Sequence, residues 1–365
     1  MLGLENVPFM GIEDIPDWER RLDRQDAFWQ RELIDRPVVC FTLPRPQPRP
    51  PWPTPRPWPT LRDRWWDAEW LAECALAGTA NAEYWGDALP QAWPNLGPEV
   101  FSCFFGAEME YGESTSWSLP FIEDWGDVAK LRFSEDNRYW RKLTEITDAL
   151  LAAGKGRFYV GMTDMHPGGD ALAAWRDPLQ LNLDMVDARP EVERLLAWTN
   201  EQFAGIFDYW HGKLRAAGQA CCSWPGMVSR LKWAVPSNDF SCMISKRMFD
   251  EVFLPGVAAE CRHVQVSVYH LDGPGALQHL DSLLSIPELS AIQWVYGDGH
   301  GRASDWLPVY KRCQAAGKGL QIHLGLDELD LFMAELHPQG LWLGLSGVGD
   351  RDQAQAVLKK VGKWR

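Results

Sequence analysis

Polar side chains that can carry acid–base chemistry or bind a metal follow several apolar segments of this sequence. Each stands where a β-rich or apolar run ends: Asp164, His166, Asp239, His270, Asp272, Asp298, His300, His323 and Asp327. Histidine nitrogen and carboxylate oxygen atoms can together bind Zn²⁺, Mn²⁺ or Fe²⁺ and leave a position open for water or substrate. The same groups can act without a metal as general acid and base, when burial and neighbouring charges separate their pKa values. The residue types leave both chemistries open.

The stretch "VSVYHLDGPGALQHL" (266–280) presents His270 and Asp272 between a β-rich run and a Gly-Pro-Gly turn. We expect His270 to be a site residue because it is a polar residue near the end of the run. Asp272 directly precedes Gly273 and Pro274, and an aspartate in such a position can cap a helix that has proline in its first turn. A metal or substrate contact is the other role open to Asp272, and the two roles can coexist.

The segments that must position these residues alternate between strand-like and helix-like patterns. The strand-like runs are "RPVVCFTL", "RFYVGM", "QACCSW", "VQVSVYHL", "AIQWVY", "LQIHLG" and "LWLGLS". Helical patterns fall between the later runs, at 190–216, 246–261, 275–285, 303–316, 327–336 and 350–361. Alternation with nearly continuous apolar strands predicts a parallel sheet with crossover helices. About eight strands favour a (β/α)8 TIM barrel over an open sheet, and in either architecture the site lies at the carboxyl ends of the strands.

We expect residues 1–35 to form an N-terminal helical extension and residues 36–365 to form one barrel domain. A proline-rich insertion at 43–60 interrupts the pattern, because frequent proline prevents helix formation and favours polyproline II structure. This insertion is either a stiff surface loop or an arm that covers the site or a neighbouring subunit. The arm would carry Arg45, Arg49, Arg56, Trp52 and Trp58.

Composition excludes several classes of protein. The formal net charge is -14, which argues against binding of nucleic acid through its phosphates. No apolar run approaches the ~20 residues that a membrane span needs. The beginning of the chain lacks the pattern of a signal peptide, and the cysteines show neither C-x-x-C nor zinc-finger spacing. We therefore expect a cytoplasmic protein with reduced thiols.

The sequence contains 21 tryptophans. Many occupy amphipathic positions, where they are core residues, but others stand beside proline, glycine or aspartate in expected loops. A flat apolar side chain in such a loop can line a pocket. We expect this role for Trp93, Trp117 and Trp224.

Several of these segments resemble the uroporphyrinogen decarboxylase superfamily, which includes methyltransferases that work with corrinoid proteins. "SNDFSCMISKRMFDEVFLPGV" is similar to the family's Asp, then Ser-Pro-x-x-Phe, then a helix entered through Pro, and "VSVYHLDG" is similar to its strand that ends in His-x-Cys-Gly. "AIQWVYGD" and "KGLQIHLGLDEL" resemble the next two strands. The resemblance runs from about Arg36 to the C-terminus and implies a single (β/α)8 barrel with N-terminal helices.

This sequence departs from the decarboxylases at three places. The proline-rich segment replaces their Arg-Gln-Ala-Gly-Arg motif, which holds the acidic side chains of the porphyrinogen. Asn95 in "WPNLG" matches the position of their catalytic Asp, and Ser346 matches the His of their last strand. We therefore do not expect decarboxylation of uroporphyrinogen.

The zinc methyltransferases of the superfamily bind metal through the His-x-Cys pair and a later cysteine. Here His270 is present, Asp272 takes the place of the cysteine, and no cysteine follows Cys313. Carboxylate oxygen is a harder ligand than thiolate, so such a site suits oxygen substrates or a metal other than zinc. The resemblance implies His270 and Asp272 as ligands of a divalent metal, zinc or another, and Asp239 as an orienting acid.

Our preferred hypothesis is methyl transfer on a small organic substrate, with a corrinoid present only through a partner protein. The alternatives are a metal-independent decarboxylase or lyase of a small acid, and a catalytically inactive ligand-binding barrel. The expected catalytic residues are His270, Asp239 and Asp298. The expected substrate-binding residues are Trp93, Asn95, Trp117, Asp164, His166, Trp224 and His323. We expect no nucleic-acid or membrane partner, and a homodimer remains open.

Overall fold

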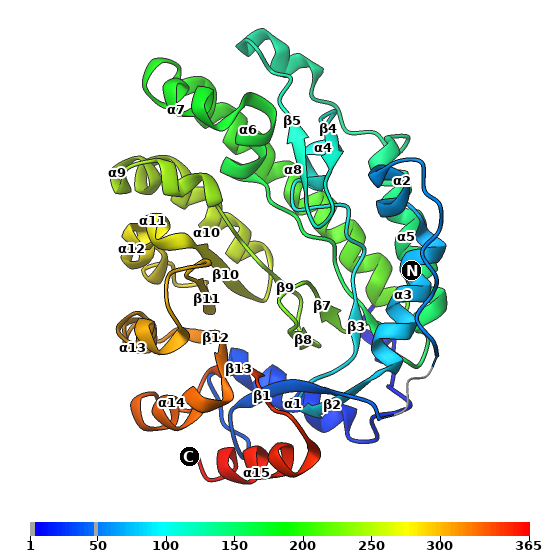
Figure 1. The fold of residues 1–365 in the computed structure, drawn as a ribbon. Coiled ribbons are helices and arrows are strands. Elements are labelled where there is room, and N and C mark those ends of the chain that lie inside the picture. Colours follow the sequence, from blue (N-terminus) through cyan, green and yellow to red (C-terminus); the bar gives the residue numbers. More distant parts are fainter. Residues whose placement is uncertain (1–3, 47–49) are drawn as a thin grey trace.

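The computed structural model describes residues 4–46 and 50–365, and its centre is a curved sheet (Figure 1). Seven strands pair in the order β2-β1-β13-β12-β11-β10-β9. They are β1 (Val38–Pro44), β2 (Ala82–Gly86), β9 (Trp233–Ala234), β10 (Val266–Asp272), β11 (Ala291–Val295), β12 (Gly319–Gly325) and β13 (Leu341–Ser346). All neighbours are parallel except β1 and β2, which are antiparallel. The expected mostly parallel α/β sheet is confirmed.

Helices follow the strands of the second half and lie outside the curved sheet (Figure 1). They are α9 (Lys246–Met248), α10 (Leu254–His263), α11 (Gly273–Ala276), α12 (Leu280–Leu284), α13 (Leu307–Ala315), α14 (Leu329–Glu335) and α15 (Arg351–Val361). Short 3₁₀ and π turns join or precede them, at η3 (Asp239–Met243), η4 (Phe249–Phe253), η5 (Leu277–His279), η6 (Ala303–Trp306) and η7 (Leu326–Glu328). Strand and helix therefore alternate as the apolar runs predict.

Short strands continue the curve beyond β9. They are β3 (Gln91–Ala92), paired with β6 (Tyr159–Val160), and β7 (Cys221–Cys222), paired with β8 (Val228–Ser229). The amide of Met162 donates to Cys222 O at 2.8 Å, which joins the end of β6 to β7. The indole of Trp233 donates to Cys221 O at 2.8 Å, which joins β7 to β9. Within residues 4–46 and 50–365 no strand pairing closes this row into a ring. The structure therefore shows a barrel-like α/β arrangement, and the closed barrel stays a prediction.

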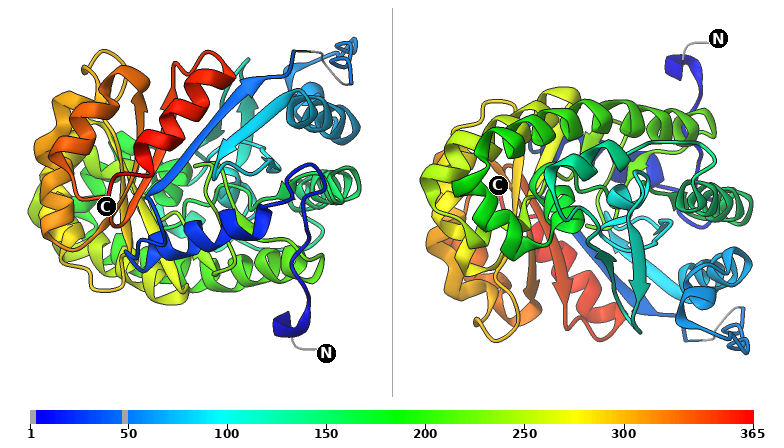
Figure 2. Two further views of the ribbon diagram at one scale, coloured as in Figure 1. Left: turned by 90° about the horizontal axis from the view of Figure 1, so that it is seen from below. Right: turned by 90° about the horizontal axis from the view of Figure 1, so that it is seen from above.

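The N-terminal segment packs beneath the sheet. After η1 (Leu4–Asn6), α1 (Trp18–Trp29) crosses one end of the curved row of strands (Figure 2). Gln25 of α1 is buried, accepts from the amide of Val228 at 2.8 Å and donates to Asp87 O at 2.9 Å. These bonds tie α1 to the strands that it covers.

The middle of the chain supplies a layer of helices and one hairpin. These elements are α2 (Leu61–Trp65), α3 (Ala68–Ala80), α4 (Val100–Cys103), β4 (Glu108–Tyr111), β5 (Ser116–Leu119), η2 (Trp125–Lys130), α5 (Arg138–Gly154), α6 (Gly168–Arg176), α7 (Pro178–Asp187) and α8 (Arg189–Ala216). The long helix α8 buries Leu196, Phe203, Phe207, Trp210 and Leu214, which recur every three to seven residues and therefore lie on one face. Many of the tryptophans belong to this aromatic core, as their amphipathic positions predict.

The proline-rich segment lies along α3. Arg56 bonds Asp67 at 3.0 Å, the indole of Trp58 donates to the same carboxylate at 3.0 Å, and the rings of Trp58 and Trp70 meet edge to face. This part of the segment is a surface loop tied to a helix. Residues 47–49, with Arg49 among them, lie outside the described residues.

The eight cysteines are free thiols, and most are buried. Across the described ranges, no helix is both long enough and apolar enough to cross a lipid bilayer.

Candidate functional site

Polar residues from three strand ends and one helix start meet in a single cluster. Asp164 and His166 follow β6, Ser237 and Asp239 follow β9, and His270 and Asp272 end β10. Asp170 joins them from the first turn of α6. The segment after β9 lies beside β10 because the amide of His270 donates to Pro236 O at 2.9 Å, and Ser237 forms a β-bridge to His270. We call these seven residues the acid–histidine cluster.

His166 is buried between two carboxylates. Its Nε2 lies 2.7 Å from Asp164 Oδ1, and its Nδ1 lies 3.4 Å from Ser237 Oγ and 3.5 Å from Asp170 Oδ2. Burial disfavours the charged ring, but Asp164 and Asp170 outweigh it and raise the pKa of His166 well above its usual range. His166 is therefore an imidazolium with both nitrogens engaged. Its ring has no lone pair for a metal, although its atoms lie within 4.8 Å of those of Asp170 and Asp239.

Asp170 and Asp239 share Ser237, but their pKa values are shifted in opposite directions. Ser237 Oγ lies 3.1 Å from Asp170 Oδ2 and 3.2 Å from Asp239 Oδ1. Burial opposes ionisation of Asp170, but the bond to His166 prevails and lowers its pKa. Burial, followed by repulsion from Asp170, raises the pKa of Asp239 to about 6. Asp239 can therefore gain or lose a proton near neutral pH.

The ring of His270 is oriented by a glutamine on the neighbouring strand. Its Nδ1 lies 2.6 Å from Oε1 of Gln293, which stands opposite His270 in the β10–β11 register. An amide oxygen only accepts, so the proton of the neutral ring is on Nδ1 and Nε2 keeps its lone pair. That Nε2 lies 4.0 Å from Asp272 Oδ2. Trp224 covers the ring edge to face at 5.0 Å and donates its indole proton to Asp164 at 2.9 Å.

Asp272 ends β10 and stands at the N-cap position directly before α11, but its side chain makes no capping hydrogen bond. The capping role that the sequence suggested is therefore wrong for this conformation. The turn at Gly273, with φ 75°, leads the chain away and leaves the half-exposed carboxylate near the cluster. Asp239, His270 and Asp272 each offer one ligand atom, and these atoms lie within 4.8 Å of one another.

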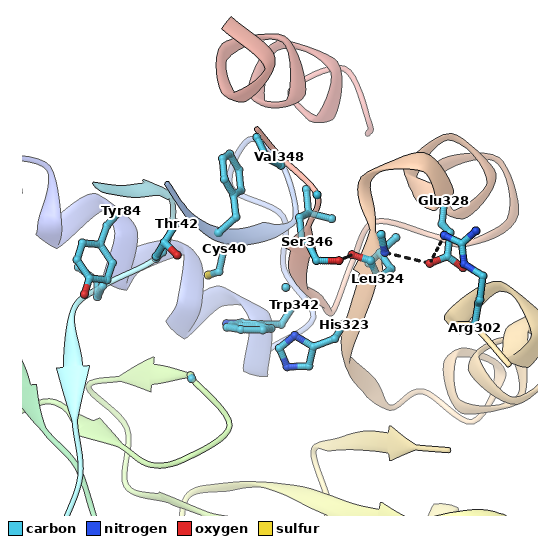
Figure 3. Close-up of a pocket in the computed structure, with 18 of the residues that line it drawn as sticks. Cys40, Thr42, Tyr84, Arg302, His323, Leu324, Glu328, Trp342, Ser346 and Val348 are labelled. Carbon is cyan, nitrogen blue, oxygen red and sulfur yellow. Dashed lines mark hydrogen bonds and ion pairs between the residues drawn. The ribbon is translucent and has the colours of Figure 1, made fainter. Parts of the chain in front are cut away.

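A pocket of about 810 Å³ opens at the carboxyl ends of β1, β12 and β13 (Figure 3). Arg302, His323 and Trp342 are among its walls. The Nε2 atoms of Gln321 and His323 lie 2.8 Å apart, so the amide donates to the ring and the ring proton is on Nδ1. Burial of the ring lowers the pKa of His323. The side chain nevertheless lines the open pocket. Gly344 is required beside it, because a Cβ there would collide with Nδ1.

The loop 224–226 forms a wall shared by the cluster and the pocket. Trp224 covers His270, Pro225 O accepts from Gln321 at 3.3 Å, and Gly226 lines the pocket. Among the described residues that line the pocket none belongs to the cluster, so this loop is what connects the two. The arrangement combines His166, whose pKa is raised, Asp239, a carboxyl group with a pKa of about 6, and His270, whose Nε2 takes no part in the bond to Gln293.

The structure separates the residues that the sequence proposed for the site. Asp164, His166, Trp224, Asp239, His270 and Asp272 lie together, and His323 lies in the adjoining pocket. Asp298 is exposed on a glycine-rich loop and has no hydrogen bond or ion pair with any described residue. Asn95 closes a turn by accepting from the amide of Gly97 at 2.8 Å. The chemical roles of all these residues remain predictions.

Two of the expected tryptophans lie away from the cluster contacts. Trp117 is 46% exposed on β5 and donates to Glu110 of the paired strand β4 at 3.2 Å. Trp93 is half-buried in the segment after β3.

Sequence reasoning missed three residues that contact the predicted site residues: Asp170, Ser237 and Gln293. Asp170 was hidden inside "MHPGGDALAAW", although its position in the first turn of a helix that follows a strand was a usable signal. Ser237 precedes Asp239 by two residues and carried no signal beyond that proximity. Gln293 is a polar residue within an otherwise apolar strand, "AIQWV", and such a residue needs a buried partner.

Comparison with known proteins finds a match in structure only. No protein-family model matches the chain, and no curated protein sequence matches it. The fold is similar to that of a methyltransferase from Methanosarcina mazei. The two structures superimpose with a TM-score of 0.57, over 93% of this chain and 98% of that one, at 12% sequence identity. At this identity the similarity shows the shared fold alone.

Proposed function

We propose that this protein is a methyltransferase that moves a methyl group between a small organic substrate and a corrinoid carrier protein. The observation that carries the proposal is the set of Asp239, His270 and Asp272, with Nε2 of His270 unblocked beside two carboxylates. Support also comes from the fold, which is similar to that of a methyltransferase over nearly the whole chain. The set occupies the place where the superfamily resemblance implies a metal-binding His-x-Cys pair.

The donor set fits a divalent metal. Asp239 and Asp272 each supply a carboxylate oxygen. His270 supplies Nε2 with its lone pair, because the bond to Gln293 holds the ring proton on Nδ1. One imidazole nitrogen and two carboxylate oxygens are ligands that suit Zn²⁺, Mn²⁺ or Fe²⁺. The set contains no thiolate, so it does not form a zinc–thiolate centre. When bound, such a metal would polarise an oxygen atom of the substrate and favour loss or acceptance of its methyl group.

The protein's own residues prepare this site. The bond to His166 lowers the pKa of Asp170, and burial together with repulsion from Asp170 raises the pKa of Asp239 to about 6. Asp239 is then either a metal ligand or the group that holds the proton that leaves or joins the substrate oxygen, but not both at once. Trp224 packs against His270, whose side chain is 12% exposed. The adjoining pocket is large enough for a small or medium organic molecule.

Metal content tests this proposal. The wild type, loaded with Zn²⁺, Mn²⁺ or Fe²⁺ and dialysed, should retain one equivalent, and His270→Ala and Asp272→Ala should lose it. His323→Ala is the matched control, because His323 is a histidine of the adjoining pocket outside the cluster. A wild type that cannot be loaded with any of the three metals would refute the metal site.

Methyl transfer itself needs a separate assay. The loaded wild type should demethylate methylcobalamin in the presence of a suitable small acceptor, and it should retain a cobalamin-binding protein in a pull-down. His270→Ala should lose the transfer while it retains the carrier. Absence of both transfer and carrier binding would contradict the proposal.

A second candidate function is a metal-independent lyase or decarboxylase that acts on a small acid. The observation that favours it is the buried pair of an imidazolium, His166, and a carboxyl group with a pKa of about 6, Asp239. Such an enzyme would keep its activity in a chelator, and its rate would change through about pH 6. Loss of activity in the chelator, with recovery on addition of metal, would exclude it.

A further inference from the structure

A second group of buried polar side chains lies behind the acid–histidine cluster. Glu260 of α10, Asn200 of α8 and Asn238, which precedes η3, line a small cavity of about 10 Å³ together with Ser237. Glu260 is 4% exposed and Asn238 is 3% exposed. Ser237 is therefore shared, because its hydroxyl contacts Asp170 and Asp239 on the cluster side.

Three oxygen atoms around this cavity lack hydrogen-bond partners among the described residues. They are Oε2 of Glu260, Oδ1 of Asn200 and Oδ1 of Asn238. A buried, unpaired polar atom destabilises the folded state, so three around one cavity call for a common partner.

Two glycines make room for the amides at the cavity. A Cβ on Gly169 would lie 2.5 Å from Asn238 Oδ1, and a Cβ on Gly256 would lie 2.6 Å from Asn200 Nδ2. Any larger residue at either position would displace an amide. Residues of three helices, α6, α8 and α10, therefore shape the cavity together.

Burial favours the neutral form of Glu260 more than the neighbouring charges oppose it. Glu260 is the one charged side chain among the described residues that line the cavity, and its nearest charged neighbours are His166 and Asp170. His166 is already paired with Asp164 and Asp170. Burial raises the pKa of Glu260 well above its usual range, and attraction to His166 does not offset it.

One water molecule completes the hydrogen bonds of all three oxygens. A neutral carboxyl group offers one O–H donor, and water offers two donors and accepts as well. Water would accept from Glu260 and donate to Asn200 and Asn238. A cavity volume of about 10 Å³ is about the least that one internal water needs.

We propose that this cavity binds one ordered water molecule, which joins the protonated carboxyl group of Glu260 to Asn200 and Asn238 and so positions the backbone that carries Ser237 and Asp239. The side chain of Asn238 makes no capping bond to η3 and is free for this role. Glu260 is then a positioning residue for the cluster. The inference goes beyond methyl transfer and does not rest on it, since it concerns the folded protein without substrate or metal.

Infrared spectroscopy tests the protonation of Glu260. The wild type at neutral pH should show the C=O band of a protonated, buried carboxyl group, and Glu260→Gln should lose that band. Glu328→Gln is the matched control, because Glu328 is equally buried but accepts from the amides of Ser304 and Gly325, which lower its pKa. A wild type without a band that Glu260→Gln removes would overturn the proposal.

Stability as a function of pH gives an independent measurement. The pKa of Glu260 is higher in the folded than in the unfolded chain, so the folded state binds one more proton between the two values. The folding constant of the wild type should fall by up to about tenfold per pH unit above about pH 4.3, relative to that of Glu260→Gln. Equal pH slopes for the two proteins would overturn the proposal. So would a rise in the folding constant with Na⁺ or K⁺ over choline at equal ionic strength, because it would indicate a bound cation.

Crystal structures of two variants test the positioning role. Glu260→Gln keeps a hydrogen-bond donor and should retain both the water and the Ser237–Asp239 contact. Glu260→Leu removes the donor and should displace Asn238 and open that contact. Structures in which both variants keep the contact, or in which the wild-type cavity holds no water, would refute this role.

Discussion

Replacement of Gln293 by leucine should weaken metal binding at His270 by about 10- to 100-fold, which is the usual effect of removing the partner that orients a ligating histidine. The free-energy equivalent is about 1.4–2.7 kcal/mol. The structure supports this magnitude, because the bond between Gln293 Oε1 and His270 Nδ1 is 2.6 Å long and Gln293 is 3% exposed. Without the amide, the proton can move to Nε2, and the ring can rotate.

The assay is calorimetric titration of the metal-free protein with Zn²⁺ and Mn²⁺. Gln321→Leu is the matched control, because Gln321 stands opposite Gln293 in the β11–β12 register, is 1% exposed and contacts His323 instead of His270. Nitrogen-15 NMR of the metal-free wild type should also show the His270 proton on Nδ1. Equal loss of affinity in both variants, or unchanged affinity in Gln293→Leu, would refute the reasoning.

Three further predictions concern stability and the pocket. Asp184→Ala should lower the free energy of unfolding by about 3–5 kcal/mol in urea denaturation, because it leaves the buried guanidinium of Arg176 without its 2.6 Å ion pair; a loss below 1 kcal/mol would contradict this. His211→Gln should make stability depend less on pH in the acid range. Burial lowers the pKa of His211 to about 4, so the folded state binds this proton only at a lower pH than the unfolded chain does. The wild type should therefore lose stability as the pH falls from 6.5 to 4. A wild-type stability that is constant over this range would argue against it. Gly344→Ala should move the His323 ring, visible as shifted imidazole resonances in NMR, at a cost of about 1–3 kcal/mol; unchanged resonances would show that the pocket tolerates a Cβ there.

The order of elements in the second half of the chain could be predicted because buried parallel strands are continuous apolar runs. β10, β12 and β13 match their runs closely. Two other runs contain strands of only two residues, β6 and β7, because pairing depends on where neighbouring strands bend and not on propensity alone. The sequence did not predict the antiparallel β2, and the expected helix 275–285 is divided into α11, η5 and α12.

For the candidate site, the sequence predicted which polar residues lie at strand ends. Asp164, His166, Asp239, His270 and Asp272 all follow runs whose carboxyl ends meet. Asp298 follows a strand in the same way, yet it is exposed, because the glycines around it carry the loop out from the sheet. The pattern of polar residues cannot show the direction of a loop.

The sequence alone determined that apolar strands and helices alternate, that the chain is acidic, and that histidine and carboxylate groups end several strands. These properties are local, because side-chain period and residue type do not depend on distant partners. Only the tertiary structure decided which of these groups meet, which nitrogen of His270 carries its proton, and why His166 is charged. Those outcomes depend on contacts between residues far apart in the chain, such as His270 with Gln293 and Ser237 with Asp170, and on the low dielectric that their burial creates.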